Sequence, residues 1–216
     1  MKTLVSALVL ALALTAPGAA LAQAQPRAAG PAASALPSQM VLSNSQRVLD
    51  ALEKRRPEFT RNRGALHAFI RSEFNQMFDR EHAARLVLGA RARGAQPAEI
   101  RAFADALAEN LMRRYGSSLL DFNTRLTPRI KSQTALPGKF GVRVNSELVR
   151  GGGDPVPVAY WMHQVNGQWK VYDVQIEGVS MISTFRNQFA APLAQKGIAQ
   201  VTRELGSGQI QADARR

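Results

Sequence analysis

The hydrophobic period of the chain changes near residue 122, and this change restricts the folds that the sequence can adopt. Up to that point, apolar side chains recur every three or four residues, most regularly from Ile100 to Phe122. That spacing places them along one face of a helix. Beyond it, four segments alternate or are rich in β-branched and aromatic residues, which is typical of strands. These segments are 124–134, 139–150, 157–165 and 168–177.

The helical period returns after the last of these strands, through Phe185 and Phe189, and a final helix is expected over residues 193–205. Asn166-Gly167 separates the last two strands, and this dipeptide favours the type I′ turn of a two-residue hairpin. Helices, then strands, then closing helices predict an α+β domain, with helices packed on one face of a curved four-stranded antiparallel sheet. Such an architecture can close around an internal apolar cavity.

Three shorter helices are expected before the long one. Ser43 or Ser45 can cap the first of them. The second, over residues 66–78, carries a wide aromatic face. The third covers residues 83–88 and is expected to end at Gly89, since glycine is favoured just beyond a helix.

The first 22 residues have the three-part layout of a secretory signal peptide. Lys2 supplies a positive charge, residues 4–14 form an apolar core, and Ala20-Leu21-Ala22 is an A-x-A cleavage site. The apolar core is too short to span a bilayer comfortably, so the segment is expected to be removed. The expected parts of the remaining chain are a disordered leader over 23–40, one folded domain over 41–206 and a polar tail over 207–216.

The composition points to anionic partners. The chain has no cysteine, so as an exported protein it must fold without disulfides or thiolate metal ligands. Its formal net charge is +12. An exported protein rarely meets nucleic acid, and the arginines are spread along the chain rather than clustered with aromatic residues. Phospholipid head groups and acidic protein surfaces are therefore the expected partners.

The three histidines do not indicate a metal site. His67, His82 and His163 lie in three different expected elements, and no two of them have the short spacing of zinc ligands. The sequence therefore predicts neither a metal nor another cofactor.

Two groups of polar residues are compatible with catalysis. Ser180, His163 and Asp173 could form a hydrolytic triad, but the segment around Ser180 lacks the second glycine of a nucleophile elbow. Asp173 and Glu177 could form a carboxylate pair, although one solvated strand face accounts for the same residues. No catalytic residue is assigned, and a non-enzymatic function is favoured.

One face of the expected sheet is strongly apolar and would face helices rich in Phe, Leu and Met. A filled core and a lined cavity use the same residue types, and periodicity alone favours the core. Both interpretations stay open at this point. The residues of this face are Val142, Val144, Val158, Tyr160, Met162, Tyr172, Val174 and Ile176.

The C-terminal half carries a distinctive run of residues. Residues 169–182 have the sequence Trp-Lys-Val-Tyr-Asp-Val-Gln-Ile-Glu-Gly-Val-Ser-Met-Ile, and Phe-Arg-Asn-Gln-Phe follows at 185–189. Both closely resemble the signature of the MlaC family, also called the toluene-tolerance auxiliary proteins. Segment 74–78, Val87-Leu88-Gly89 and the long helix with Tyr115 and Leu119 resemble the same family in the same order.

The resemblance implies a periplasmic phospholipid carrier that maintains the lipid asymmetry of the outer membrane. Such a carrier moves lipid between an outer-membrane MlaA-type lipoprotein-porin complex and an inner-membrane MlaD-type ABC transporter complex. The resemblance also implies an NTF2-like half-cone, in which acyl chains enter a cavity between sheet and helices. Phospholipid is then cargo, and no cofactor is needed. The expected cavity residues are Phe74, Phe78, Leu107, Leu111, Tyr115, Phe185, Phe189 and the eight residues of the apolar sheet face.

Two functions from other classes remain open. An NTF2-like cavity could serve a small-molecule enzyme that uses Asp173 or His163. A basic surface could instead serve an adaptor that binds protein partners and carries no lipid. Diacyl phospholipid bound to the purified protein would favour the carrier over both.

Overall fold

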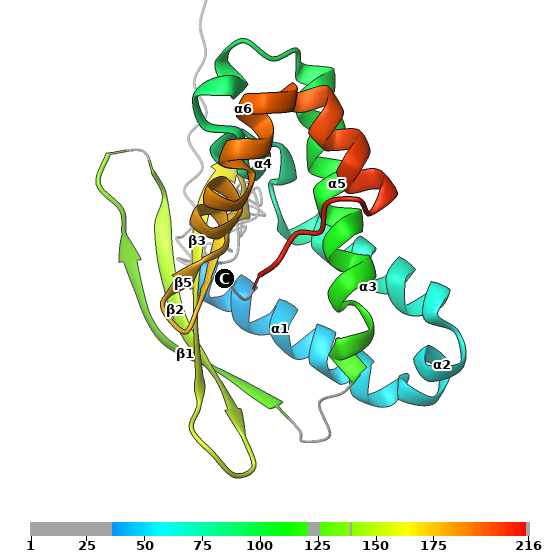
Figure 1. The fold of residues 1–216 in the computed structure, drawn as a ribbon. Helices are drawn as coiled ribbons and strands as arrows, with labels where there is room; N and C mark the ends of the chain where they lie inside the picture. Colours follow the sequence, from blue (N-terminus) through cyan, green and yellow to red (C-terminus); the bar gives the residue numbers. More distant parts are fainter. Residues whose placement is uncertain (1–35, 121–125, 139, 215–216) are drawn as a thin grey trace, which may run out of the picture. The chain divides into compact units, whose positions relative to one another are not determined.

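The structure is a computed structural model that describes residues 36–120, 126–138 and 140–214. The expected signal peptide and residues 23–35 of the expected leader lie outside them. The described residues belong to one unit, in which helices and strands follow in the expected order (Figure 1). The expected closing helices are joined in one element, which is kinked at Gly197 and not separated at residue 193. The elements are α1 (Pro37–Lys54), α2 (Arg56–Arg61), α3 (Arg63–Met77), α4 (Arg80–Leu88), η1 (Gly89–Arg93), α5 (Pro97–Tyr115), η2 (Ser117–Leu120), β1 (Leu126–Ala135), β2 (Val142–Arg150), β3 (Val156–Val165), β4 (Gln168–Ile176), β5 (Val179–Ser180) and α6 (Met181–Ser207).

Helix α1 begins at Pro37, inside the segment that was expected to be a leader. Proline is favoured in the first turn of a helix, because the N–H that it lacks would have no partner there. Ser43 lies within the helix, where its hydroxyl donates to the carbonyl oxygen of Met40 at 3.2 Å. The prediction of a serine cap is therefore wrong, and the helix starts before the expected domain boundary at residue 41.

The other N-terminal helices begin and end at residues that suit those positions. Asp79 caps α4 by accepting a hydrogen bond from the N–H of His82 at 2.9 Å, and Gly89 ends this helix with a φ of 60°. A capping box opens α5. Helix α5 ends at Tyr115 and gives way to η2, so the helix is shorter than the expected one, whose apolar period extended to residue 122.

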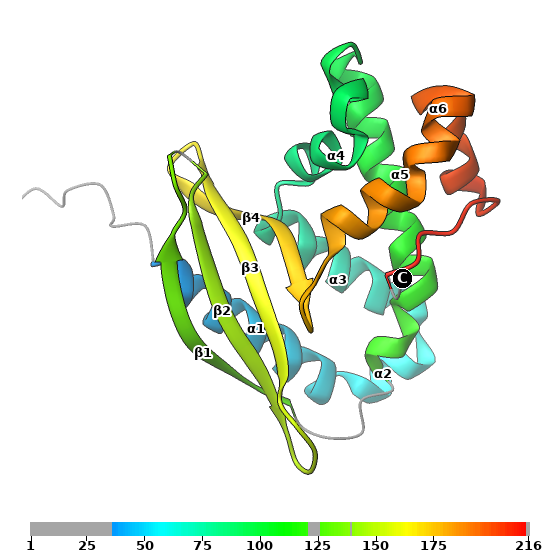
Figure 2. The same cartoon turned by 60° about the vertical axis from the view of Figure 1, so that its left-hand side comes forward.

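The strands form one antiparallel sheet in the order β1-β2-β3-β4-β5. The four long strands lie within three residues of their expected bounds, and β5 adds a fifth strand of two residues. Asn166 and Gly167 have φ values of 51° and 78°, which confirms the two positive angles of the predicted type I′ hairpin turn. Helix α1 runs across one face of the sheet (Figure 2). The predicted α+β architecture is therefore confirmed.

Strand β4 contains a bulge. Trp161 of β3 pairs with Asp173, whereas the next residue, Met162, pairs with Val171. Tyr172 is thus an extra residue on β4, and it interrupts the regular alternation of side chains along this strand.

The outer edge of β4 is only partly covered. Phe78 forms an isolated parallel bridge with Val171 near one end, and β5 pairs with Gln175 and Ile176 near the other. Between these contacts, residues 172–174 have no strand partner on that side within the described residues. This part of the edge faces the helices.

Helix α6 is followed by a segment that folds back onto the domain. Residues 208–214, the red segment in Figure 1, run along α5 and α6. Asn110 of α5 donates to the carbonyl oxygen of Ile210 and accepts from the N–H of Ala212, both at 2.8 Å. Ala212 is fully buried. The described part of the segment expected to be a polar tail is therefore packed against the domain.

Most of the buried apolar residues fall into three clusters. The first lies among α4, α5 and α6 around Phe103 and Phe189. The second joins α1 to the sheet around Val41 and Val144. The third joins α1, α2 and α3 around Phe59. Because the first two clusters are distinct, one continuous core does not join the sheet to helices α4 to α6.

Candidate functional site

A cavity of about 380 Å³ lies between the edge of the sheet and the helices. Its walls come from α3, α4, α5, the first turns of α6 and strand β4. Apolar side chains form most of the lining, including the stacked rings of Phe74 and Phe78, whose centroids are 4.1 Å apart. Pockets that bind small molecules typically measure about 300–1,000 Å³. The cavity is therefore large enough for part of an apolar ligand.

Small side chains keep this space open. Ala83 and Ala84 on α4, Ala104 and Ala108 on α5 and Ala214 of the C-terminal segment all line the cavity. Residues four apart lie on the same face of a helix, so the two alanines of α5 stand one above the other. A leucine at these positions would fill the space that alanine leaves empty. Alanines on the sheet-facing side of a helix are thus a sequence signal for a cavity.

The structure brings together nine of the fifteen residues that were expected to line a cavity. These nine are Phe74, Phe78, Leu107, Leu111, Tyr115, Tyr172, Val174, Ile176 and Phe185. The expectation is corrected for the other six, which do not line it. These six are Val142, Val144, Val158, Tyr160, Met162 and Phe189.

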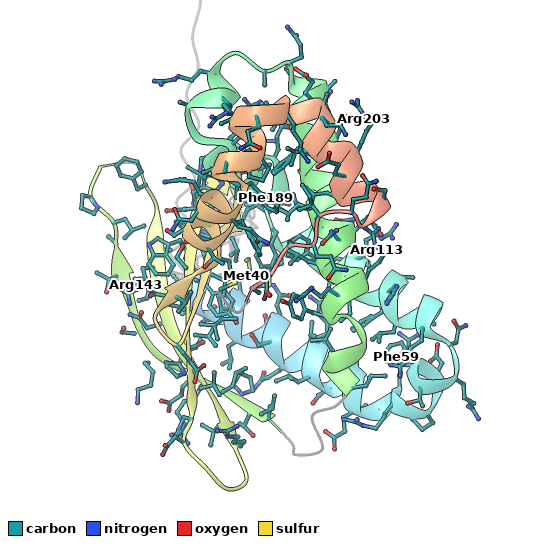
Figure 3. The ribbon with its side chains drawn as sticks, in the orientation of Figure 1. Met40, Phe59, Arg113, Arg143, Phe189 and Arg203 are labelled. Atoms are coloured by element: carbon teal, nitrogen blue, oxygen red, sulfur yellow. The ribbon has the colours of Figure 1, made fainter. Side chains whose placement is uncertain are left out.

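Helix α1 explains why most of the strand residues among these six are excluded. Val41 of α1 packs with Val144 and Met162 in the sheet core, and none of the three is more than 1% exposed. The helix thereby covers a part of the sheet face that the alternation had assigned to a ligand. Phe189 instead lies among the helices, edge to face with Phe103 at 6.0 Å between ring centroids (Figure 3).

Charged side chains stand at the border of the apolar lining. Arg71 of α3 pairs with Glu109 of α5, and Arg80 of α4 pairs with Asp105 of α5 at 2.9 Å. Both arginines and Glu109 line the cavity. Exposed ion pairs of this kind contribute about 0.2–1 kcal/mol each, so a ligand can displace them at small cost. The sequence analysis did not find these residues, because exposed charges on three separate helices share no pattern.

Asp173 supports the start of α6. Its Oδ2 accepts from the hydroxyl of Ser180 at 2.7 Å, and its Oδ1 accepts from the N–H of Ile182 at 3.1 Å. His163 lies elsewhere, with its Nε2 3.0 Å from Oδ2 of Asp79. The hydrolytic triad considered for Ser180, His163 and Asp173 is therefore not assembled.

Two histidines pack together beside β4. The ring centroids of His82 and His163 lie 4.6 Å apart, and each lies 5.2 Å from that of Tyr172. Burial lowers the pKa of His82, and the charges of His163 and Arg85 lower it further, while Asp79 raises it. Burial also raises the pKa of Tyr172. These surroundings favour the neutral form of the His82 imidazole.

Residues 36–120, 126–138 and 140–214 contain no group of three or more His, Cys, Asp or Glu side chains arranged to hold a metal ion. In the same part of the chain, no helix combines the length and the apolar character needed to cross a membrane. The cavity and its charged border are the main candidate site.

Comparisons with known proteins agree with this geometry. A family model described as "MlaC protein" matches residues 42–207. The chain is 23% identical over 168 residues to the toluene tolerance protein ttg2D of Pseudomonas putida, and the match covers 76% of each chain. Among solved structures, it is similar to a phospholipid-binding protein from Ralstonia solanacearum in complex with a phospholipid. That match has a TM-score of 0.69 and 22% identity, and it covers 79% of this chain and 94% of the other. Because the family model spans well over half of its length, the chain belongs to the MlaC family.

Proposed function

We propose that the chain is a periplasmic phospholipid carrier. It moves lipid between an outer-membrane MlaA-type lipoprotein-porin complex and an inner-membrane MlaD-type ABC transporter complex, and so maintains outer-membrane lipid asymmetry. The observation that carries this proposal is the apolar cavity, kept open by alanines and bordered by charged side chains. Membership of the MlaC family and a fold shared with a phospholipid-binding protein support it. The secretory pattern of the first 22 residues supports the periplasmic location.

A carrier is needed because acyl chains cross water poorly. Two acyl chains hold about 30 methylenes, and at about 0.8 kcal/mol each their exposure to water costs on the order of 24 kcal/mol. A protein cavity of similar apolarity makes exchange between membrane and carrier nearly neutral. The docking partners then set the direction of transport, and this chain supplies neither ATP nor covalent chemistry.

In this proposal the nine cavity residues contact the acyl chains, and Val174 is well placed for a test. It lines the cavity, whereas Val144, on the same face of the sheet, is completely buried beneath α1. An aspartate at Val144 is an unpaired charge in a packed core and is expected to unfold the domain. An aspartate at Val174 can keep water once the acyl chains are gone. Val174→Asp is therefore expected to be folded and free of lipid.

The experiment uses the exported chain, purified and extracted with organic solvent, with mass spectrometry of the extract and circular dichroism melting. The wild type is expected to contain diacyl phospholipid in near-stoichiometric amount. A wild type without phospholipid would sink the carrier function. A folded Val174→Asp variant with a full complement of phospholipid would contradict the assignment of the cavity.

A further inference from the structure

A second cavity of about 320 Å³ adjoins the apolar one. The two share Asn75, Phe78, Arg80 and Ala104 as lining residues, so they meet along one border. We call this second space the polar chamber, because all but one of its remaining lining residues are charged. Those remaining residues are Asp79, Glu81, Arg101, Asp105, Val165 and Lys170.

The polar chamber has as many basic as acidic side chains, but not every one of them has a partner. Three basic side chains, those of Arg80, Arg101 and Lys170, stand among three acidic ones. Arg80 pairs with Asp105, and Lys170 donates to a backbone carbonyl oxygen of α3. Arg101, by contrast, has no hydrogen bond or ion pair with any residue that the structure describes.

The acidic side chains have partners within the fold. Asp79 contacts His163 and caps α4, while Glu81 pairs with Arg85 at 2.7 Å. An anion that enters the polar chamber therefore finds one uncommitted guanidinium group, that of Arg101. The carboxylates form only weak ion pairs at the surface, so they can also contact a cation that enters the polar chamber.

We propose that the polar chamber is a head-group subsite that favours a phosphate joined to a primary amine, as in phosphoethanolamine. This inference rests on the proposed carrier function, with the acyl chains in the adjoining apolar cavity. The phosphate lies against Arg101 and Arg80, and the amine lies against Glu81 and Asp105. A head group with a phosphate and no amine makes no ion pair with Glu81 or Asp105, so it binds less well.

The test measures which lipid the exported chain takes from vesicles that contain equal amounts of phosphatidylethanolamine and phosphatidylglycerol with identical acyl chains. The bound lipids are extracted and quantified by mass spectrometry. The wild type is expected to enrich phosphatidylethanolamine about 1.4- to 5-fold, the range that one exposed ion pair supplies. Arg101→Gln should lower the loading of both lipids, and Glu81→Gln should bring their ratio close to that of the vesicles. Arg61→Gln, on the exposed surface of α2 and away from both cavities, is the matched control.

The outcomes separate the subsite from the carrier function. If the wild type takes up the two phospholipids in the ratio of the vesicles, the subsite proposal fails and the carrier function stands. The same holds if Arg101→Gln and Arg61→Gln load equal amounts of lipid. A wild type that takes up no phospholipid overturns both proposals. Calorimetric titration with inorganic phosphate and with glycerophosphoethanolamine distinguishes a lipid head group from a free phosphate. Neither is expected to bind without acyl chains, and phosphate binding that is lost in Arg101→Gln would make the polar chamber a site for soluble phosphate instead.

Discussion

Asn110 holds the C-terminal segment against α5, and its replacement tests how much this segment stabilises the wall of the cavity. The side chain is only 3% exposed. Its amide nitrogen donates to the carbonyl oxygens of Leu205 and Ile210, and its oxygen accepts from the N–H of Ala212, all at 2.8 Å. Two residues further on, Ala214 lines the cavity. A loss of these bonds should therefore weaken both the fold and the cavity wall.

Asn110→Ala leaves two backbone groups without their partner, the carbonyl oxygen of Ile210 and the N–H of Ala212. Leu205 is affected less, since its carbonyl oxygen still accepts from Arg113 at 2.7 Å. Each unsatisfied buried group costs about 1–3 kcal/mol. The upper end is not reached, because the segment can detach locally and let water reach both groups. We expect a loss of about 2 kcal/mol and a decrease in Tm of about 4–8 °C.

Urea unfolding followed by circular dichroism measures the loss, and hydrogen exchange at the Ala212 amide shows whether the segment has loosened. Asn145→Ala is the control, because Asn145 donates to Ser132 on an exposed part of the sheet. That variant should stay within about 0.5 kcal/mol of the wild type. An Asn110→Ala variant with wild-type stability and unchanged exchange at Ala212 would refute the reasoning.

His82→Gln should weaken the fall in stability on acidification. Because the pKa of His82 is lowered in the folded state, the unfolded chain binds the proton more readily between that pKa and 6.5, and stability falls as the pH drops through this window. Urea midpoints at about pH 5 and about pH 7.5 should lie closer together in the variant, and an unchanged difference contradicts this cause. Gly141→Ala should lower the free energy of unfolding by more than about 1 kcal/mol. Gly141 has a φ of 96°, and a Cβ would lie 1.9 Å from the carbonyl oxygen of Met162. Gly151→Ala has open space and should be nearly neutral, so thermal melts that rank the two variants equally contradict the steric argument.

The strands could be located from the sequence because local signals mark their ends. Asn166-Gly167 requires a tight turn with two positive φ angles, and the structure has one there. The start of α1 could not be located in this way, since a proline and a serine several residues apart both suit a helix start. A distant contact accompanies the actual start: the N–H of Ser38 donates to Oε1 of Gln133 on β1 at 3.0 Å. No local pattern contains a contact across 95 residues.

The helical part of the cavity was predicted better than the sheet part. Of the seven helical residues expected there, only Phe189 lies elsewhere, because its position on α6 faces α5. The amphipathic period of a helix identifies its buried side, and on α5 that side supplies Leu107 and Leu111 to the cavity. On α3 only the last turns reach the cavity, through Phe74, while Leu66 and Phe69 pack in the cluster around Phe59. The charged border depends on where α3, α4 and α5 meet, so Arg71 and Arg80 could not be found from any one helix.

On the sheet, the border between core and cavity runs between two neighbouring strands. Tyr160 of β3 and Val174 of β4 are direct cross-strand partners on the same face, and both pack against the core beneath α1, yet only Val174 also lines the cavity. Alternation assigns both to one apolar face, and it cannot separate them, because it describes one layer of the fold. The opposite layer decides the outcome: α1 fills the space over β2 and β3, while the alanines of α4 and α5 leave space beside β4. The bulge at Tyr172 places Val171 and Val174 on the same face, with Val171 fully buried in the core and Val174 at the edge of this core, against the cavity. A cavity therefore depends on two facing layers. In this chain, the small residues on the helices are its clearest sign in the sequence.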